Sequence, residues 1–385
     1  MKVRNGTPNG PVPKLATPIC ERLQSAVSDK VARVKGFVTK VGDAPQRTDS
    51  PLRFVDLFCG LGGFRVAAEE ESKVKQQPVR CVFSSDFDAD SQLMYHANFG
   101  EKPAGDITRI EASSVPEHDL LFAGFPCQAF SIIGQSKGFE DTRGTLFFDV
   151  ARVLSLHRPR AFVLENVRGL TGHDRGRTLT VIMKTLRDLD YAVEFRVLNA
   201  LHFGLPQKRE RVVIVGIRKD LEHSFSWPRK SDQPPTPLED ILEDNSEVDE
   251  RYFASPEIRT SRQAAVKGKR LPDGRSIWHE NKSGNVSPLG FSCALRAGAS
   301  YNYLLVDGVR RLTPREMLRL QGFPEDYKIV VSYQAMRKLA GNSVPIPMIQ
   351  AVVGNLMDAL ASSPAGESAF GSEQVELELE LELHA

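Results

Sequence analysis

The fold is clearest in the stretch Asp56-Leu57-Phe58-Cys59-Gly60-Leu61-Gly62-Gly63-Phe64, in which three of nine residues are glycine. It joins an apolar run, Phe54–Phe58, to a helical pattern near Phe64–Glu71. Glycines at a strand-to-helix turn let a ligand approach the backbone and the N-terminus of the helix. The second apolar run leads to Asp86, 23 residues after the last of these glycines, where a carboxylate can hold both hydroxyls of a ribose. We therefore expect a nucleoside site, with a plain tight turn as the alternative.

From Leu52 to about Lys219, short apolar runs alternate with helical patterns. Such alternation predicts an α/β fold with a mostly parallel sheet covered on both faces. The predicted strands are Phe54–Phe58, Val79–Ser84, Asp119–Ala123, Arg160–Leu164, Tyr191–Val197 and Arg211–Ile217. The predicted helices are Phe64–Glu71, Asp88–Asn98, Phe147–His157 and Thr178–Leu189, followed late in the chain by Pro314–Arg319, Tyr333–Ala340 and Ile346–Leu360.

The pattern breaks in residues 229–310, which are rich in Pro, Gly, Ser and Asn and hold only short strand-like pieces such as Tyr301–Val306. A change of this kind predicts a smaller, loop- and β-rich domain inserted into the larger one. The predicted organisation is an N-terminal extension at 1–50, partly helical or disordered, a main domain at 51–228 and 311–361, the inserted domain at 229–310, and an acidic low-complexity tail at 362–385.

Charge is unevenly distributed, although the formal net charge is only +1. Residues 251–312 hold eleven Lys or Arg and four acids, directly after residues 239–250 with seven acids and no base. The basic stretch suits a polyanion, and an ordinary solvated surface is the alternative. The chain shows no signal peptide and no long apolar span, so we expect no membrane association. Its five scattered cysteines favour a reducing cytosol without disulfides or a metal site.

Four further strings carry residues suited to chemistry. Gly124-Phe125-Pro126-Cys127-Gln128-Ala129-Phe130-Ser131 puts a cysteine at the mouth of the sheet, where a nucleophile and an inert buried thiol are both open interpretations. Glu165 ends an apolar strand, and a buried carboxylate is costly unless it is paired or used. Arg209 and Arg211 are two apart and so share one face of an extended segment. Asn342, before the last helix, could be no more than an N-cap.

These strings, in this order, resemble the bacterial C5-cytosine-specific DNA methyltransferases of the HhaI methyltransferase type, from about Arg53 to Leu360. The resemblance implies a Rossmann-like, S-adenosylmethionine-dependent methyltransferase domain, with residues 229–310 as the target-recognition domain. It implies sequence-specific methyl transfer from S-adenosyl-L-methionine to C5 of a flipped cytosine in double-stranded DNA, through a covalent bond between Cys127 and C6. The resemblance further implies a bacterial enzyme of a restriction-modification system, located in the cytoplasm and associated with the nucleoid.

The resemblance also implies roles for single residues. Cys127 matches the nucleophile, Glu165 the residue that contacts N3 and the exocyclic amine, and Arg209 and Arg211 the residues that orient the base. The positions that match cofactor contacts are Phe58, Gly60, Leu61, Gly63, Asp86, Phe87, Asp106, Ile107, Pro126, Leu146 and Asn342. The residues expected to contact DNA are Gln128, Ser131, Arg143 and Arg296, with Lys267, Lys269 and Arg270 as candidates for phosphate contacts.

Where the family often has Thr-Leu near the end of the recognition domain, this chain has Ala294-Leu295. The residue that fills the space of the flipped base is expected within Asn281–Leu295. We expect a monomer, and a cognate endonuclease that acts on the same DNA site without direct contact. The alternatives are an RNA cytosine-5 methyltransferase of the same fold and a catalytically dead DNA-binding relative.

Overall fold

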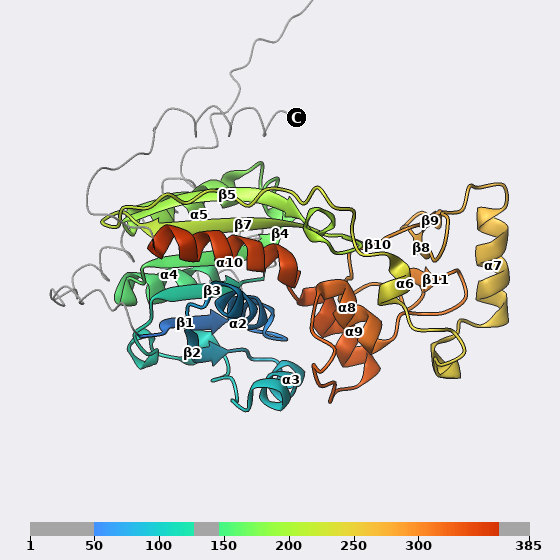
Figure 1. Ribbon diagram of the computed structural model, residues 1–385, viewed down its shortest axis with the longest axis horizontal. Helices are drawn as coiled ribbons and strands as arrows, with labels where there is room; N and C mark the ends of the chain where they lie inside the picture. Colours follow the sequence, from blue (N-terminus) through green and yellow to red (C-terminus); the bar gives the residue numbers. More distant parts are fainter. Residues whose placement is uncertain (1–49, 127–145, 362–385) are drawn as a thin grey trace, which may run out of the picture. The chain divides into compact units, whose positions relative to one another are not determined.

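The computed structural model describes residues 50–126 and 146–361. Within these residues the main sheet has six strands in the order β2-β1-β3-β4-β7-β5 (Figure 1). β2, β1, β3 and β4 run parallel to one another, and β7 runs antiparallel to both β4 and β5. The mostly parallel sheet predicted from sequence is confirmed. The strands are β1 (Leu52–Leu57), β2 (Val79–Ser85), β3 (Leu120–Gly124), β4 (Ala161–Val167), β5 (Tyr191–Asn199) and β7 (Glu210–Arg218).

Helices cover both faces of the sheet, with α2 and α10 in front of it and α4 and α5 behind it in Figure 1. α2 buries Phe64, Ala67 and Ala68 against the sheet, and Glu69 and Glu70 on its other side are more exposed, as its apolar periodicity predicts. The helices of this part are α2 (Gly63–Lys75), α3 (Ala89–Phe99), α4 (Leu146–His157), α5 (Arg177–Asp188) and α10 (Ile346–Ala361). Short 3₁₀ turns are η1 (Ile107–Arg109), η2 (Ala112–Ser114), η5 (Arg168–Leu170) and η6 (Ala200–Phe203).

The strand order reverses between β1 and β3. From β1 the chain steps to β2 on one side, and β3 and β4 then extend the sheet on the other side. Ligands of such sheets bind outside the carboxyl ends of the strands at this switch point. The order therefore brings three segments to one edge: the glycine turn after β1, Asp86 after β2, and Pro126 after β3.

The region predicted as the inserted domain contains a three-stranded antiparallel sheet in the order β11-β8-β9. Val266, Trp278 and Val286 form a small core of their own there. A second, two-stranded parallel pairing joins β10 to β6, so this region is tied to the main domain. The elements are β6 (Gln207–Lys208), α6 (Leu238–Ile241), η7 (Glu250–Tyr252), α7 (Pro256–Val266), β8 (Ile277–Glu280), β9 (Val286–Leu289), β10 (Ser292–Cys293) and β11 (Leu304–Val306).

Two further helices, α8 (Pro314–Gln321) and α9 (Tyr333–Asn342), follow the inserted region. α8 starts with a capping box in which Thr313 and Glu316 satisfy each other's backbone amides, with Pro314 at its first turn. Glu316 also pairs with Arg310 at 2.7 Å, and both side chains are fully buried. The core likewise continues from Leu304 and Val306 into Leu312 and Met317. The hydrophobic core therefore continues across residues 310 and 311, where the sequence predicted the end of the inserted domain.

Some sequence-based boundaries are wrong in detail. Asn342 is the last residue of α9 and Ser343 caps its C-terminus, so neither is the N-cap of the last helix, which starts at Ile346. Pro345 disfavours a helical conformation at the residue before it, which explains the break. The stretch Tyr333–Ala361 is apolar and long enough to cross a membrane, but it forms these two helices, and most of it is buried in the core. The strand predicted at Tyr301–Val306 is shorter in the structure, where β11 starts only at Leu304.

Candidate active site

The glycine turn after β1 has an unusual backbone. Phe58 takes a φ of 56°, in the left-handed region that bulky residues rarely adopt, and Gly60 (54°) and Gly62 (74°) also have positive φ. A Cβ on Gly62 would lie 2.5 Å from the ring of Phe99, so only glycine fits there. Gly62 is the N-cap of α2 and makes no side-chain hydrogen bond, which leaves backbone N–H groups of the first turn without a side-chain partner. Strained backbone beside such donors is typical of ligand sites.

Asp86 lies beside this turn. Its Oδ2 accepts a hydrogen bond from the backbone N–H of Gly60 at 2.8 Å, and its Oδ1 accepts one from Asp88 at 2.9 Å. Burial raises the pKa of the Asp86 carboxyl. The next residue, Phe87, is 71% exposed, which is rare for a large apolar ring. A carboxylate and an uncovered aromatic ring therefore border the glycine turn, as a nucleoside ligand requires.

Asp56, near the end of β1, is a residue that our sequence analysis did not single out. Its side chain is fully buried, and neither carboxyl oxygen has a hydrogen-bond partner among the described residues. Burial raises the pKa of Asp56 to about 8, against the opposing charge of Arg65. An acid inside an apolar run was the available signal, the same signal that pointed to Glu165.

The other predicted cofactor residues are placed as follows. A Cβ on Gly63 would meet Val344 at 2.7 Å, so the segment after Asn342 packs against the glycine turn, and Asn342 itself is exposed. Asp106 is bound to its own 3₁₀ turn, accepting from the backbone N–H of Thr108 at 3.0 Å. Ile107 is buried, Leu61 is buried, Leu146 begins α4, and Pro126 is the last described residue after β3.

Glu165 and Arg211 form a buried pair at the same edge of the sheet. Glu165 lies opposite Gly124 of β3 on one side and Val213 of β7 on the other. Arg211 is two residues before Val213 and therefore shares its face. The Nε of Arg211 lies 2.6 Å from Oε1 of Glu165, with side chains 11% and 8% exposed. Burial raises the pKa of Glu165, and Arg211 opposes that shift.

Asn166 supports the chain that leads out of β3. Its Nδ2 donates a hydrogen bond to the carbonyl of Phe125 at 2.8 Å, and its side chain is buried. The sequence patterns alone assign no role to Asn166. The predicted residues Cys127, Gln128, Ser131 and Arg143 lie outside the described residues.

Arg209 makes contacts with the protein backbone that the sequence did not predict. Its side chain is fully buried, and its guanidinium donates to the backbone carbonyls of Leu295, Gly341 and Ser343. All of these acceptors are main-chain atoms of the protein, and Nε of Arg209 has no hydrogen-bond partner among the described residues. These contacts indicate a structural role for Arg209 in addition to the predicted one, whereas Arg211 lies beside Glu165 as expected from their shared face.

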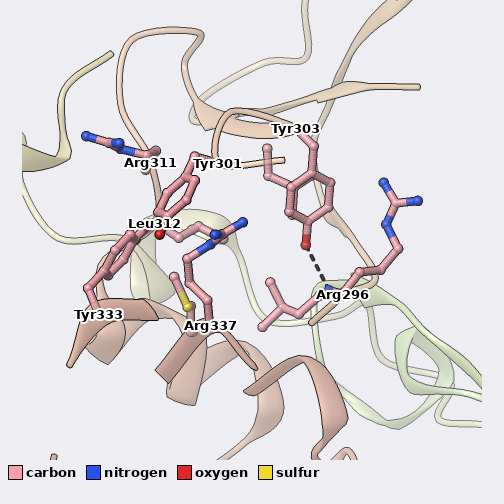
Figure 2. Close-up of a pocket in the computed structure, with 10 residues that line it drawn as sticks. Arg296, Tyr301, Tyr303, Arg311, Leu312, Tyr333 and Arg337 are labelled. Atoms are coloured by element: carbon pink, nitrogen blue, oxygen red, sulfur yellow. Dashed lines mark hydrogen bonds between the residues drawn. The ribbon is translucent and has the colours of Figure 1, made fainter. Parts of the chain in front are cut away.

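Arginine and tyrosine side chains gather on one surface between α9 and the segment before β11, which we call the arginine–tyrosine face (Figure 2). Arg337 lies over the ring of Tyr301 at 4.1 Å, and Arg296 over the ring of Tyr303 at 4.8 Å. The hydroxyl of Tyr303 accepts from the backbone N–H of Arg296 at 2.9 Å. The face consists of Arg296, Tyr301, Tyr303, Arg311, Tyr333 and Arg337. Among the described residues, none of its three arginines has a carboxylate within ion-pair distance.

The basic segment 267–270 is less available than its sequence suggests. The ammonium group of Lys269 donates to the carbonyl of Val286 at 2.6 Å and so closes the small core of the inserted region. Lys267 and Arg270 are exposed. Arg311 and Arg337 of the arginine–tyrosine face also donate to backbone carbonyls. The arginine–tyrosine face and the exposed side chains of Lys267 and Arg270 are therefore both candidates for contact with a polyanion.

Comparisons with known proteins identify the family of this chain. The profile of the C-5 cytosine-specific DNA methylase family matches residues 52–358. The type II methyltransferase M.NgoBI of Neisseria gonorrhoeae is 53% identical over 297 residues, which cover 77% of this chain and 90% of that protein. M.HhaI of Haemophilus parahaemolyticus is 39% identical over 330 residues, covering 81% and 96%.

Among solved structures, a mutant of DNMT2 from Spodoptera frugiperda has a TM-score of 0.60 at 20% identity, covering 80% of this chain and 99% of that one, which is a likeness of fold. The predicted fold class and the family resemblance are confirmed, and neither the RNA methyltransferase nor the dead relative is favoured. The chain belongs to the C-5 cytosine-specific DNA methylase family and is a DNA cytosine-5-methyltransferase.

Proposed function

We propose that this enzyme methylates one cytosine within a specific sequence of double-stranded DNA, and that the cytosine leaves the duplex to react. The pair of Glu165 and Arg211 carries the proposal, because it is buried at the carboxyl edge of the sheet. A base that stays stacked inside a duplex cannot reach groups at that depth, whereas a flipped base can. Asn166 holds the chain that leads from β3 toward Cys127 next to this pair.

Cys127 is the proposed nucleophile. Its thiolate forms a bond to C6 of cytosine, and the electron pair of the C5–C6 double bond makes C5 nucleophilic. S-adenosyl-L-methionine, the methyl donor expected for this family, would supply a methyl group on a positively charged sulfur. Attack by C5 would break the bond between sulfur and methyl and leave neutral S-adenosyl-L-homocysteine. Water then accepts the C5 proton, and the bond between Cys127 and C6 breaks, so the aromatic ring and the thiolate are both restored.

Glu165 is the proposed proton donor to N3 of the cytosine. Thiolate addition pushes negative charge into the ring, and a proton from Glu165 at N3 neutralises it. That proton returns to Glu165 when the thiolate leaves C6. Burial raises the pKa of Glu165, which keeps the donating neutral form available. Arg211, 2.6 Å away, orients the carboxyl group and offers fixed positive charge to the ring oxygen O2.

The residues around the glycine turn fit S-adenosyl-L-methionine. Asp86 would bind the ribose hydroxyls, and the exposed ring of Phe87 would stack on the adenine. Asp56 is a buried carboxyl group without a partner among the described residues, close enough to Cys59 and Asp86 to interact electrostatically with both. The remaining proposed contacts are Phe58, Gly60, Leu61, Gly63, Asp106, Ile107, Pro126, Leu146 and Asn342.

The arginine–tyrosine face is the proposed contact surface for the DNA backbone. Its arginines lack carboxylate partners within the described chain, and phosphate contacts from arginine set affinity and register. Arg296 is proposed to read a base edge, because its stacking on Tyr303 orients the guanidinium and no side-chain hydrogen bond of the described structure uses it.

The biological setting follows from the relatives, which are named type II methyltransferases. We infer a restriction-modification role, in which a separate endonuclease cuts the same sequence when it is unmethylated. We also infer a monomer that acts in the bacterial cytoplasm on the chromosome, since double-stranded DNA is the proposed substrate.

The test is a methylation assay with labelled S-adenosyl-L-methionine on duplex DNA, single-stranded DNA and RNA, followed by bisulfite sequencing of the labelled duplex. The proposal expects label in duplex DNA, confined to the C5 position of cytosines in one short sequence. Label in RNA alone, or methylcytosine scattered without a sequence rule, would contradict it.

A further inference from the structure

Gln207 and Arg209 together bind both backbone polar groups of one residue in the inserted region. Oε1 of Gln207 accepts from the N–H of Leu295 at 3.0 Å, and Nη1 of Arg209 donates to the carbonyl of Leu295 at 2.9 Å. Both side chains are fully buried. The next residue is Arg296, the proposed base reader. The segment that carries Arg296 is therefore held by two side chains, Gln207 and Arg209, that come from the chain next to the catalytic edge of the sheet.

The same guanidinium also binds the segment around Asn342. Nη2 of Arg209 donates to the carbonyl of Gly341 at 2.9 Å and to that of Ser343 at 2.5 Å. These two residues flank Asn342, and a Cβ on Gly341 would overlap the backbone nitrogen of Ala297. One buried arginine thus joins two chain segments whose backbones already touch.

The two-residue spacing of Gln207, Arg209 and Arg211 links the base-reading segment to Glu165. Residues 207, 209 and 211 alternate along an extended segment, so their side chains share one side of it. The first two bind Leu295 and the third pairs with Glu165. A buried guanidinium has a fixed fork of donors, and lysine cannot reproduce three such bonds from one point charge.

We propose that Arg209, assisted by Gln207, is a positioning residue that sets the base-reading segment Leu295–Ala297 against the Gly341–Ser343 turn, and so couples target discrimination to the catalytic edge. This inference rests on the proposed function, in which Arg296 reads a base. In this proposal Arg209 acts through the protein backbone.

The experiment compares Arg209→Lys and Gln207→Met with Arg310→Lys as the matched control. Arg310 is equally buried, and its bonds within the described chain reach neither Leu295–Ala297 nor Gly341–Ser343. For each full-length variant we would measure the thermal midpoint, and kcat and KM on the cognate duplex and on duplexes with one base pair changed.

We expect Arg209→Lys and Gln207→Met to raise the KM for cognate DNA and to reduce discrimination against the changed duplexes by roughly tenfold. Arg310→Lys should lower the thermal midpoint and leave discrimination as in the wild type. If Arg209→Lys and Gln207→Met lower only kcat and keep full discrimination, the proposal is wrong and Arg209 serves catalysis or stability alone. Should Arg209→Lys not fold, the Gln207→Met result decides. A wild-type enzyme that methylates no duplex selectively would instead refute the proposed function.

Discussion

The Nε of Arg211 lies 2.6 Å from Oε1 of Glu165, although 46 residues separate them in sequence. The antiparallel register of β4 and β7 sets Glu165 opposite Val213, so Arg211 is its diagonal neighbour on the same face. Burial raises the pKa of the carboxyl group, and the arginine limits the rise. In the proposed mechanism Glu165 is the proton donor, and Arg211 lowers the pKa of its carboxyl group.

The first prediction concerns this control. If neutral Glu165 donates a proton to N3, the rate should fall as pH rises through the pKa of Glu165. Arg211→Gln removes the charge that lowers that pKa, so the falling limb of the kcat profile should move to higher pH while kcat itself drops. Glu165→Gln should reduce kcat by about 10²–10⁴ and remove the limb. A limb that stays at the same pH in Arg211→Gln would show that Glu165 is not the titrating donor.

The second prediction uses Asp56, whose pKa burial raises to about 8. The folded state then holds a proton between pH 4 and 8 that the unfolded state has released, so stability must fall as pH rises through this window. The expected slope is about 1.4 kcal/mol per pH unit. Asp56→Asn, which cannot ionise, should lose this slope and be relatively more stable near pH 8. Denaturant unfolding of both proteins at several pH values measures the difference, and equal slopes would contradict the assignment.

The third prediction separates the two residues that border the glycine turn. Asp86→Ala removes a carboxylate that would bind two hydroxyls and also accepts the N–H of Gly60, so cofactor affinity should fall by at least tenfold, about 1.4 kcal/mol. Phe87→Leu keeps an apolar side chain but removes the stacking ring, and we expect a smaller loss. Calorimetry with S-adenosyl-L-methionine gives both values. Val74→Ala, at an exposed apolar position, is the control and should bind normally. Unchanged binding by Asp86→Ala would remove Asp86 from the site.

The fourth prediction locates the phosphate contacts. Arg311→Gln with Arg337→Gln should weaken binding to matched and mismatched duplexes alike, and should reduce the salt slope by about 1 for each lost contact. The double variant Lys267→Gln and Arg270→Gln removes the same charge from exposed positions elsewhere and should keep the wild-type slope. The opposite ranking of the two double variants would place the DNA on the 267–270 segment.

The sequence predicted the strands and helices of the main domain well, because short continuous apolar runs and the three-to-four-residue period of helices report directly on burial. The boundaries failed where the backbone departs from regular geometry. Phe58 belongs to the first apolar run but has a left-handed φ and lies outside β1, and Asn342 ends one helix where an N-cap of the next was considered.

Residue roles were harder to predict, because spacing gives a shared face but not the partner. Arg209 and Arg211 share a face, yet one binds three backbone carbonyls and the other a carboxylate. Those carbonyls lie some 86 to 134 residues away in sequence, so no local pattern indicates them. Lys269 shows the same limit: its charge suggested a phosphate contact, and its actual partner is the carbonyl of Val286.

The covalent role of Cys127 is the central claim, and trapping tests it most directly. A duplex that carries 5-fluorocytosine at the target position cannot lose a proton from C5 after methylation, so the bond between enzyme and base should persist. With S-adenosyl-L-methionine present, we predict a denaturant-stable complex between this duplex and the wild-type enzyme. Cys127→Ser should form no such complex and turn over at well under a tenth of the wild-type rate, with DNA and cofactor binding largely retained. A stable complex with Cys127→Ser, or none with the active wild type, would contradict the account.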